Sequence, residues 1–100
     1  MDIFCLVVLE DTLGKLERRP IVHDRRSRLA ECVTVIRACM DLLSMNPDNR
    51  DYTNTIRKAL TELAGIARRN GDFIIAWRLK MVIHQLGSTG DADRRLAQTA

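Results

Sequence analysis

The pattern of apolar and polar positions divides the chain into four segments separated by three turns. The turns are Arg19-Pro20, residues 46–49 and Asn70-Gly71-Asp72. Between them, apolar residues recur at intervals of three and four, which is the periodicity of an amphipathic α-helix. The pattern therefore predicts four elements, at residues 2–18, 24–45, 47–69 and 73–86.

The first segment leaves two interpretations open at its start. Leu9, Leu13 and Leu16 recur at helical spacing, which favours a helix over 2–18. Residues 2–9 also suit a strand, because they are apolar on every side and contain a pair of valines. Gly14 weakens a helix by about 1 kcal/mol relative to alanine. Pro20 ends the segment, because proline pushes the preceding residue out of the α region.

The two middle segments carry the clearest helical stripes. Over 24–45, where Asp24 is the predicted N-cap, a broad apolar stripe runs through Leu29, Cys32, Val33, Ile36, Cys39, Met40 and Leu43. Over 47–69, Ile56, Leu60 and Leu63 share one face. Asn46 is the predicted cap of this helix, with Pro47 at its first position. Gly71 is expected to end it in the left-handed conformation.

The last segment, 73–86, is almost entirely apolar, whereas residues 88–100 are small and polar. We predict one helical domain over 1–87 and a flexible tail over 88–100. The first and last helices are apolar around their whole girth, which is more than a 100-residue domain can bury. The expected architecture is an all-α bundle of three to four helices with short antiparallel connections, assembled as a symmetric homodimer. The predicted interface residues are Leu6, Leu9, Phe73, Trp77 and Met81, and a groove for a foreign helix is the alternative.

Composition narrows the class of protein. The chain is 46% hydrophobic and 29% charged, with 4% aromatic residues and 2 prolines, which disfavours both disorder and an all-β fold. No apolar run approaches the ~20 residues of a membrane span, and the amino terminus lacks the basic start of a signal peptide. The three cysteines form no CxxC pair, so we predict buried thiols in the reducing cytoplasm, with no metal and no cofactor. No catalytic motif is present, and we predict that the protein is not an enzyme.

Positive charge gathers in the middle of the chain. Residues 25–80 contain 11 basic and 6 acidic residues, a net charge of +5, and most of the basic residues are arginine. Arginine pairs with phosphate through two parallel hydrogen bonds, although a gene rich in arginine codons would give the same bias. Arg25, Arg26 and Arg28 crowd the start of a predicted helix, where the helix dipole is also positive. The cluster therefore indicates an anionic partner.

A second basic feature is the row Arg57, Thr61, Gly65 and Arg68, which spans roughly 16 Å of one helix face. Arginine can bind phosphate, threonine can bond a 2′-hydroxyl, and glycine permits close approach, which are the contacts that duplex RNA offers. A solvated helix face is the simpler alternative. We predict a protein that binds double-stranded RNA without sequence specificity, through Arg25, Arg26, Arg28, Arg57, Lys58, Thr61, Gly65, Arg68 and Arg69.

In size, charge and helical content the chain resembles the small dimeric RNA-silencing suppressors of nodaviruses, which lay paired helices along duplex RNA. No sequence motif aligns, so the resemblance assigns no residue. The alternative function is a protein-interaction module or regulatory adaptor that uses apolar helix faces. Phe73 and Trp77, one helical turn apart, would be typical contact residues of such a module.

Overall fold

The chain folds into helices throughout the part that the structure describes. The computed structural model describes the backbone of residues 3–21 and 23–99 and the side chains of residues 4–21 and 24–86. These residues form four helices and no strand: α1 (Ile3–Glu17), α2 (His23–Met45), α3 (Arg50–Arg69) and α4 (Phe73–Thr99). The all-α prediction is confirmed, and the first segment is a helix from Ile3 onward rather than a strand.

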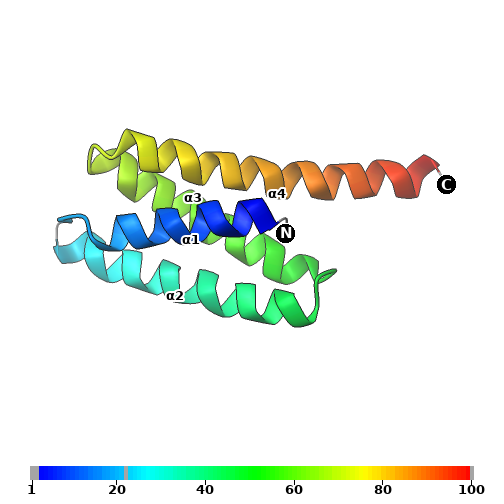
Figure 1. Cartoon of the computed structure of the whole chain (residues 1–100), viewed down its shortest axis with the longest axis horizontal. Coiled ribbons are helices and arrows are strands. Elements are labelled where there is room, and N and C mark those ends of the chain that lie inside the picture. Colours follow the sequence, from blue (N-terminus) through cyan, green and yellow to red (C-terminus); the bar gives the residue numbers. More distant parts are fainter. Residues whose placement is uncertain (1–2, 22, 100) are drawn as a thin grey trace.

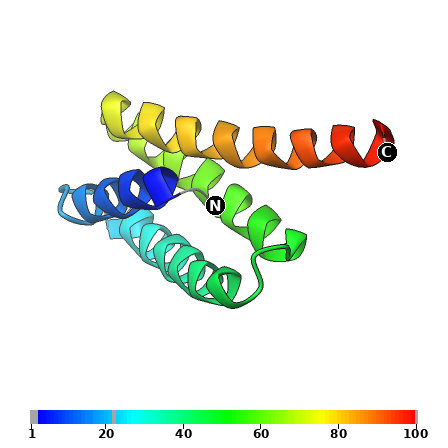
Figure 2. The same cartoon turned by 45° about the vertical axis from the view of Figure 1, so that its right-hand side comes forward.

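Helix α3 is central to the packing of the four helices. In Figure 1, α4 follows one edge of the molecule and α2 the other, while α3 crosses behind them and α1 lies in front. Helix α3 packs against both α2 and α4, and α1 packs mainly on α4 and only slightly on α2. Figure 2 shows that the carboxyl-terminal part of α4 extends past the other three helices. This extension lengthens the molecule, which measures 50 × 24 × 21 Å.

The core consists of the apolar stripes that the sequence predicts. Leu9, Leu13 and Leu16 of α1 are fully buried, and the other helices contribute Ile36, Leu60, Leu63 and Leu79 among others. The one buried polar side chain in the described part is Thr12, whose hydroxyl donates to the carbonyl of Val8 at 2.6 Å. That bond removes most of the cost of burying the hydroxyl.

Helix α3 begins three residues later than the sequence predicts. Its N-cap is Asn49, whose side-chain oxygen accepts hydrogen bonds from the amides of Asp51 and Tyr52, at 3.0 and 3.2 Å. The predicted cap, Asn46, instead donates its amide to the carbonyl of Leu42 at 3.0 Å and so completes the end of α2. Helix α2 also begins earlier than predicted, at His23, which places Asp24 in its first turn.

Helix α4 runs beyond its predicted end. The sequence predicts that it stops near Gly87, but the helix continues through Gly87 and Gly90 to Thr99. A glycine costs a helix only about 1 kcal/mol relative to alanine, which is too little to end it without a competing turn. The predicted flexibility of residues 88–100, and with it the domain boundary at 87, stays a prediction, because the side chains of these residues lie outside the described part of the chain.

The turn between α3 and α4 has the predicted left-handed glycine. Gly71 has a φ of 84°, its amide donates to the carbonyl of Arg68 at 3.1 Å, and the amide of Asp72 donates to that of Ala67 at 2.8 Å. This pair of bonds is the Schellman motif, which satisfies carbonyls at the end of a helix.

Replacing Gly71 with alanine is therefore expected to lower the free energy of unfolding by about 1 kcal/mol, because a β-carbon disfavours this backbone conformation. A β-carbon at Gly71 would meet no atom within 4 Å, so steric clash adds nothing. The matched control is Gly65→Ala, inside α3 and equally open, which is expected to stabilise the protein by about 0.5–1 kcal/mol. Urea unfolding followed by circular dichroism measures both changes, and equal signs would contradict the assignment.

Candidate nucleic-acid interface

The outward side of α3 carries the central part of the predicted basic row. The inward side is a buried stripe formed by Ile56, Leu60, Leu63, Ala64, Ile66 and Ala67. On the opposite side, Lys58, Thr61, Arg68 and Arg69 are exposed and Gly65 is half-buried. Helical geometry therefore places these five predicted residues on one continuous surface.

Among the side chains that the structure describes, no acidic group pairs with the cations on this surface. The ion pairs within the described residues involve the basic groups of Lys15, Arg19, Arg28, Arg37 and Arg78. Lys58, Arg68 and Arg69 take part in none of them. Arg68 and Arg69 lie in the last turn of α3, where the helix dipole favours positive charge. Lys58 lies in the middle of the helix, where the dipole does not favour a positive charge. The dipole therefore does not explain why all three cations lie on this surface.

The two uncharged residues of the row, Thr61 and Gly65, add little bulk to the surface. The Thr61 hydroxyl donates to the carbonyl of Arg57 at 2.8 Å, so its oxygen remains able to accept a hydrogen bond from outside. Gly65 has no atom within 4 Å of the position a β-carbon would take. A close crossing of another helix therefore does not explain this glycine. The α3 backbone is therefore open at Gly65.

Arg57 differs from the rest of the predicted row. Its side chain is half-buried, and its Nε atom is buried without a hydrogen-bond partner in the described part of the chain. A buried donor without an acceptor ordinarily costs about 1–3 kcal/mol. Arg57 therefore lies at the edge of the α3 surface, and its guanidinium is less available than those of Arg68 and Arg69.

Arg28 is a structural bridge rather than a free cation. Its guanidinium donates to both carboxylate oxygens of Glu62 on α3, with Nη2 to Oε1 at 2.9 Å, and to Glu31 at 2.8 Å. The bonds from Arg28, followed by one from the Cys32 thiol, lower the pKa of the Glu62 carboxyl. The argument that only an external anion explains an arginine at this helix start is therefore wrong for Arg28, because α3 supplies the carboxylate.

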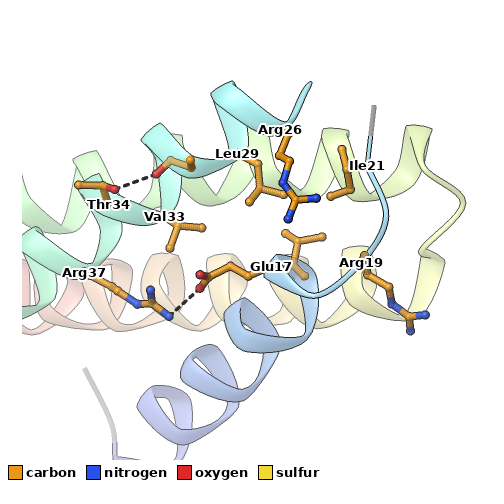
Figure 3. Close-up of a pocket in the computed structure, with 10 residues that line it drawn as sticks. Glu17, Arg19, Ile21, Arg26, Leu29, Val33, Thr34 and Arg37 are labelled. Atoms are coloured by element: carbon orange, nitrogen blue, oxygen red, sulfur yellow. Dashed lines mark hydrogen bonds and ion pairs between the residues drawn. The ribbon is translucent and has the colours of Figure 1, made fainter. Parts of the chain in front are cut away.

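The three arginines near the start of α2 do not form one cluster. Arg26 and Arg28 are two residues apart and point to opposite sides of the helix. A hollow of about 230 Å³ lies between the end of α1 and α2. Figure 3 shows Arg26 among the residues that line it, together with Arg19 and Arg37. Arg37 is paired there with Glu17 at 2.7 Å. Arg25 is half-buried. Of the three, Arg28 is the one whose hydrogen bonds to α3 are seen in the described structure.

The predicted interface residues divide into buried and exposed ones. Leu9 is fully buried in the core of its own chain, so it is not available to a partner, and Leu6 is half-buried. Phe73, Trp77 and Met81 are exposed. The predicted interface left out six further apolar residues that are exposed in the described structure: Phe4, Val7, Val35, Leu42, Met45 and Ile74. For α1 the signal was present, because Leu9, Leu13 and Leu16 define the inward stripe and thereby place Val7 on the opposite side.

Other kinds of site are not found in the described residues. The side chains of Cys5, Cys32 and Cys39 are buried, as predicted, and form no disulfide. No group of three or more His, Cys, Asp and Glu side chains there is arranged to hold a metal ion, and no described helix has an apolar stretch long enough to cross a bilayer. The fold and this site define a small all-α protein with one cationic helix face. Comparison of the chain with protein-family models, curated proteins and solved structures found no match.

Proposed function

We propose that this protein binds nucleic acid, and in particular double-stranded RNA, along the outward side of α3. The observation that carries the proposal is that Lys58, Arg68 and Arg69 are exposed together on one rigid helix face without acidic partners in the described structure. Phosphates of a duplex supply the missing counter-charge. Thr61 and Gly65 between them suit contacts with ribose hydroxyls and a close approach to the backbone. The surface has no exposed aromatic side chain for stacking bases, so contacts to sugar and phosphate would dominate.

Binding of a short RNA duplex is expected to weaken steeply with salt, because each neutralised phosphate adds about −0.9, the duplex DNA value, to the log–log slope. Reversing charge in the double variant K58E/R69E should weaken binding at least about tenfold at low salt and make the slope shallower. The matched control compares the single variants Lys58→Glu on α3 and Lys15→Glu on α1, which make the same change of charge; α1 lies in front of α3 in Figure 1. Fluorescence anisotropy with a labelled duplex measures both.

Gly65→Ala separates close contact from general attraction. The added methyl group meets no atom of the protein and leaves the net charge unchanged. It should weaken binding of the duplex if α3 lies against the backbone, and leave it unchanged if the cations act only at a distance. Absence of binding at micromolar protein and low salt, or equal loss in the Lys15→Glu control, would refute the α3 interface.

A second candidate function is that of a protein-interaction module. The observation that favours it is the exposure of large apolar side chains on more than one helix, including Leu42 and Met45 on α2 and Phe73 and Trp77 on α4. Binding of this kind would tolerate high salt and would be lost in Trp77→Ala or Phe73→Ala. Arg57→Glu would leave it intact, whereas duplex binding should weaken in the α3 variants.

A further inference from the structure

The outward side of the amino-terminal half of α4 exposes more large apolar side chains than any other helix of the described structure. Phe73, Ile74 and Trp77 are 62–70% exposed, and Met81 is 38% exposed. The inward side of the same helix, formed by Ile75, Ala76, Leu79, Val82 and Leu86, is buried against the bundle. The chain therefore leaves most of the area of Phe73, Ile74 and Trp77 uncovered.

The arrangement of these side chains is symmetric along the helix. Trp77 stands in the middle, with Phe73 four residues before it and Met81 four residues after it. Residues four apart lie on the same side of a helix. A copy of the helix running in the opposite direction presents large side chains at the same spacing, with its Met81 opposite Phe73. Self-complementarity of this kind is what a two-fold interface requires.

From this symmetry we propose that a second copy of this chain covers the face, with the two α4 helices packed antiparallel and Trp77 beside the two-fold axis. Phe73 of each copy then packs on Met81 of the other, and the two Trp77 rings meet at the centre. Aromatic residues and methionine are the residue types enriched at the centres of protein interfaces.

The exposed area suits such a dimer. Fully buried aromatic side chains contribute about 150–250 Å² each, but these four side chains are already partly covered, so together with the flanking Lys80 and His84 they offer roughly 500–600 Å² per copy. Each partner in an interface of standard size contributes about 800 Å². The face is therefore of the size of a weak, non-obligate dimer interface.

The charges near the face do not oppose this pairing. Arg78 is turned toward α1, where its guanidinium lies 3.4 Å from the Asp11 carboxylate. Lys80 is two residues further on and points to the other side of α4. In an antiparallel pair centred on Trp77, Lys80 lies opposite Phe73 and Ile74 of the second copy, so the two lysines do not meet. The lysine stem can cover apolar surface while its ammonium group stays in water.

The dimer leaves the proposed RNA-binding surface free. Lys58, Arg68 and Arg69 lie on α3, on the side turned away from the core, and none of them takes part in the α4 contact. Each dimer therefore carries two cationic faces. The proposed dimer does not rest on the proposed function, since it would form in the absence of nucleic acid.

Sedimentation velocity of the full chain tests the dimer directly. A species of twice the 11.4 kDa mass is expected by about 100 µM protein, within the range of an ordinary non-obligate interface. Trp77 is the only tryptophan, so its emission reports on the same contact. As the protein is concentrated, the emission should shift to the blue and acrylamide should quench it less.

A pair of matched variants identifies the face. Trp77→Asp should weaken dimerisation at least about 30-fold, which is the effect of losing a central aromatic contact. Met45→Asp, an equally exposed apolar position on α2, should leave it unchanged, and circular dichroism checks that both variants fold. A chain that stays monomeric at about 100 µM with unchanged emission would overturn the proposal and leave the face to a foreign protein. A dimer that survives Trp77→Asp would overturn it as well.

Discussion

Replacing Leu60 with alanine is expected to lower the free energy of unfolding by about 3 kcal/mol, within the range measured for fully buried leucines. Leu60 has no exposed area and lies in the middle of α3, which packs against both α2 and α4. The cavity left by the missing atoms is enclosed by these helices, so the site cannot collapse without moving them. A domain of this size has a total stability of about 5–15 kcal/mol, so the loss is a large share of it.

The control for Leu60→Ala is the same substitution at Leu42. Leu42 lies on the outward side of α2 and is 41% exposed, so alanine there should change the free energy of unfolding by less than about 1 kcal/mol. Urea unfolding followed by circular dichroism compares the two variants. Similar losses at both positions would mean that α3 is not the centre of the core.

The apolar periodicity of the sequence was sufficient to predict the helices and most of the core. The stripe of Leu9, Leu13 and Leu16 predicted a buried helix face, and these three residues are fully buried. A helix face is set by spacing along one segment, so no knowledge of its neighbours is needed. The left-handed Gly71 could also be predicted without knowledge of its neighbours, because glycine is the residue type that adopts this conformation at little cost.

Helix ends were predicted less well, because several residues compete for one role. Asn46 and Asn49 are both good caps, and the choice between them depends on whether α2 takes Asn46 as its own last hydrogen-bond donor. The end of α4 shows the reverse case. Gly87 resembles a stop signal, but nothing in the next residues forms a turn that competes with the helix.

The candidate site was predicted in part, and the limit was long-range pairing. The five residues on the outward side of α3 come from one segment, so spacing alone grouped them correctly. Arg28 was assigned to an external anion because its partner Glu62 is 34 residues away in sequence. Glu31, three residues from Arg28, was the only local sign that this arginine is neutralised. Sequence spacing cannot show a partner that reaches the site only after α2 and α3 have packed.

The contact between α2 and α3 also changes the chemistry of Cys32. Its thiol donates a hydrogen bond to Oε2 of Glu62 at 2.9 Å. Burial of the thiol, followed by this bond and the negative charge of Glu62, raises the pKa of Cys32 to about 12. The thiolate is the reactive form of cysteine, so a thiol held in this state is inert at neutral pH. Cys32 therefore serves as a buried donor that helps Arg28 hold the Glu62 carboxylate in place.

At about pH 8, Cys32 is expected to react with iodoacetamide at least about 100-fold more slowly than an unhindered cysteine, because so little thiolate is present. A Cys5→Ala and Cys39→Ala background leaves Cys32 as the only thiol. Its rate should keep rising with pH beyond about 10, whereas an ordinary cysteine reaches a plateau near its pKa of about 8.5. A plateau at the ordinary pH would mean that burial limits access and that the pKa is not raised.

Substitution of the two glutamates separates the effect of Glu62 on the thiol from its effect on Arg28. Glu62→Gln removes the charge beside Cys32, so the pKa should fall and the alkylation rate at about pH 8 should rise about tenfold. Glu31→Gln removes a bond to Arg28 but none to Cys32, and the charge of Glu31 is the smallest of the causes that raise the pKa of Cys32, so the rate should rise far less.

The raised pKa of Cys32 also sets a pH window for stability. The folded state holds the thiol proton more tightly than the unfolded state does, so stability is full below about pH 9 and falls as the pH rises toward 12. Glu62→Gln should flatten that alkaline fall, and an unchanged alkaline profile would show that the carboxylate does not control the thiol.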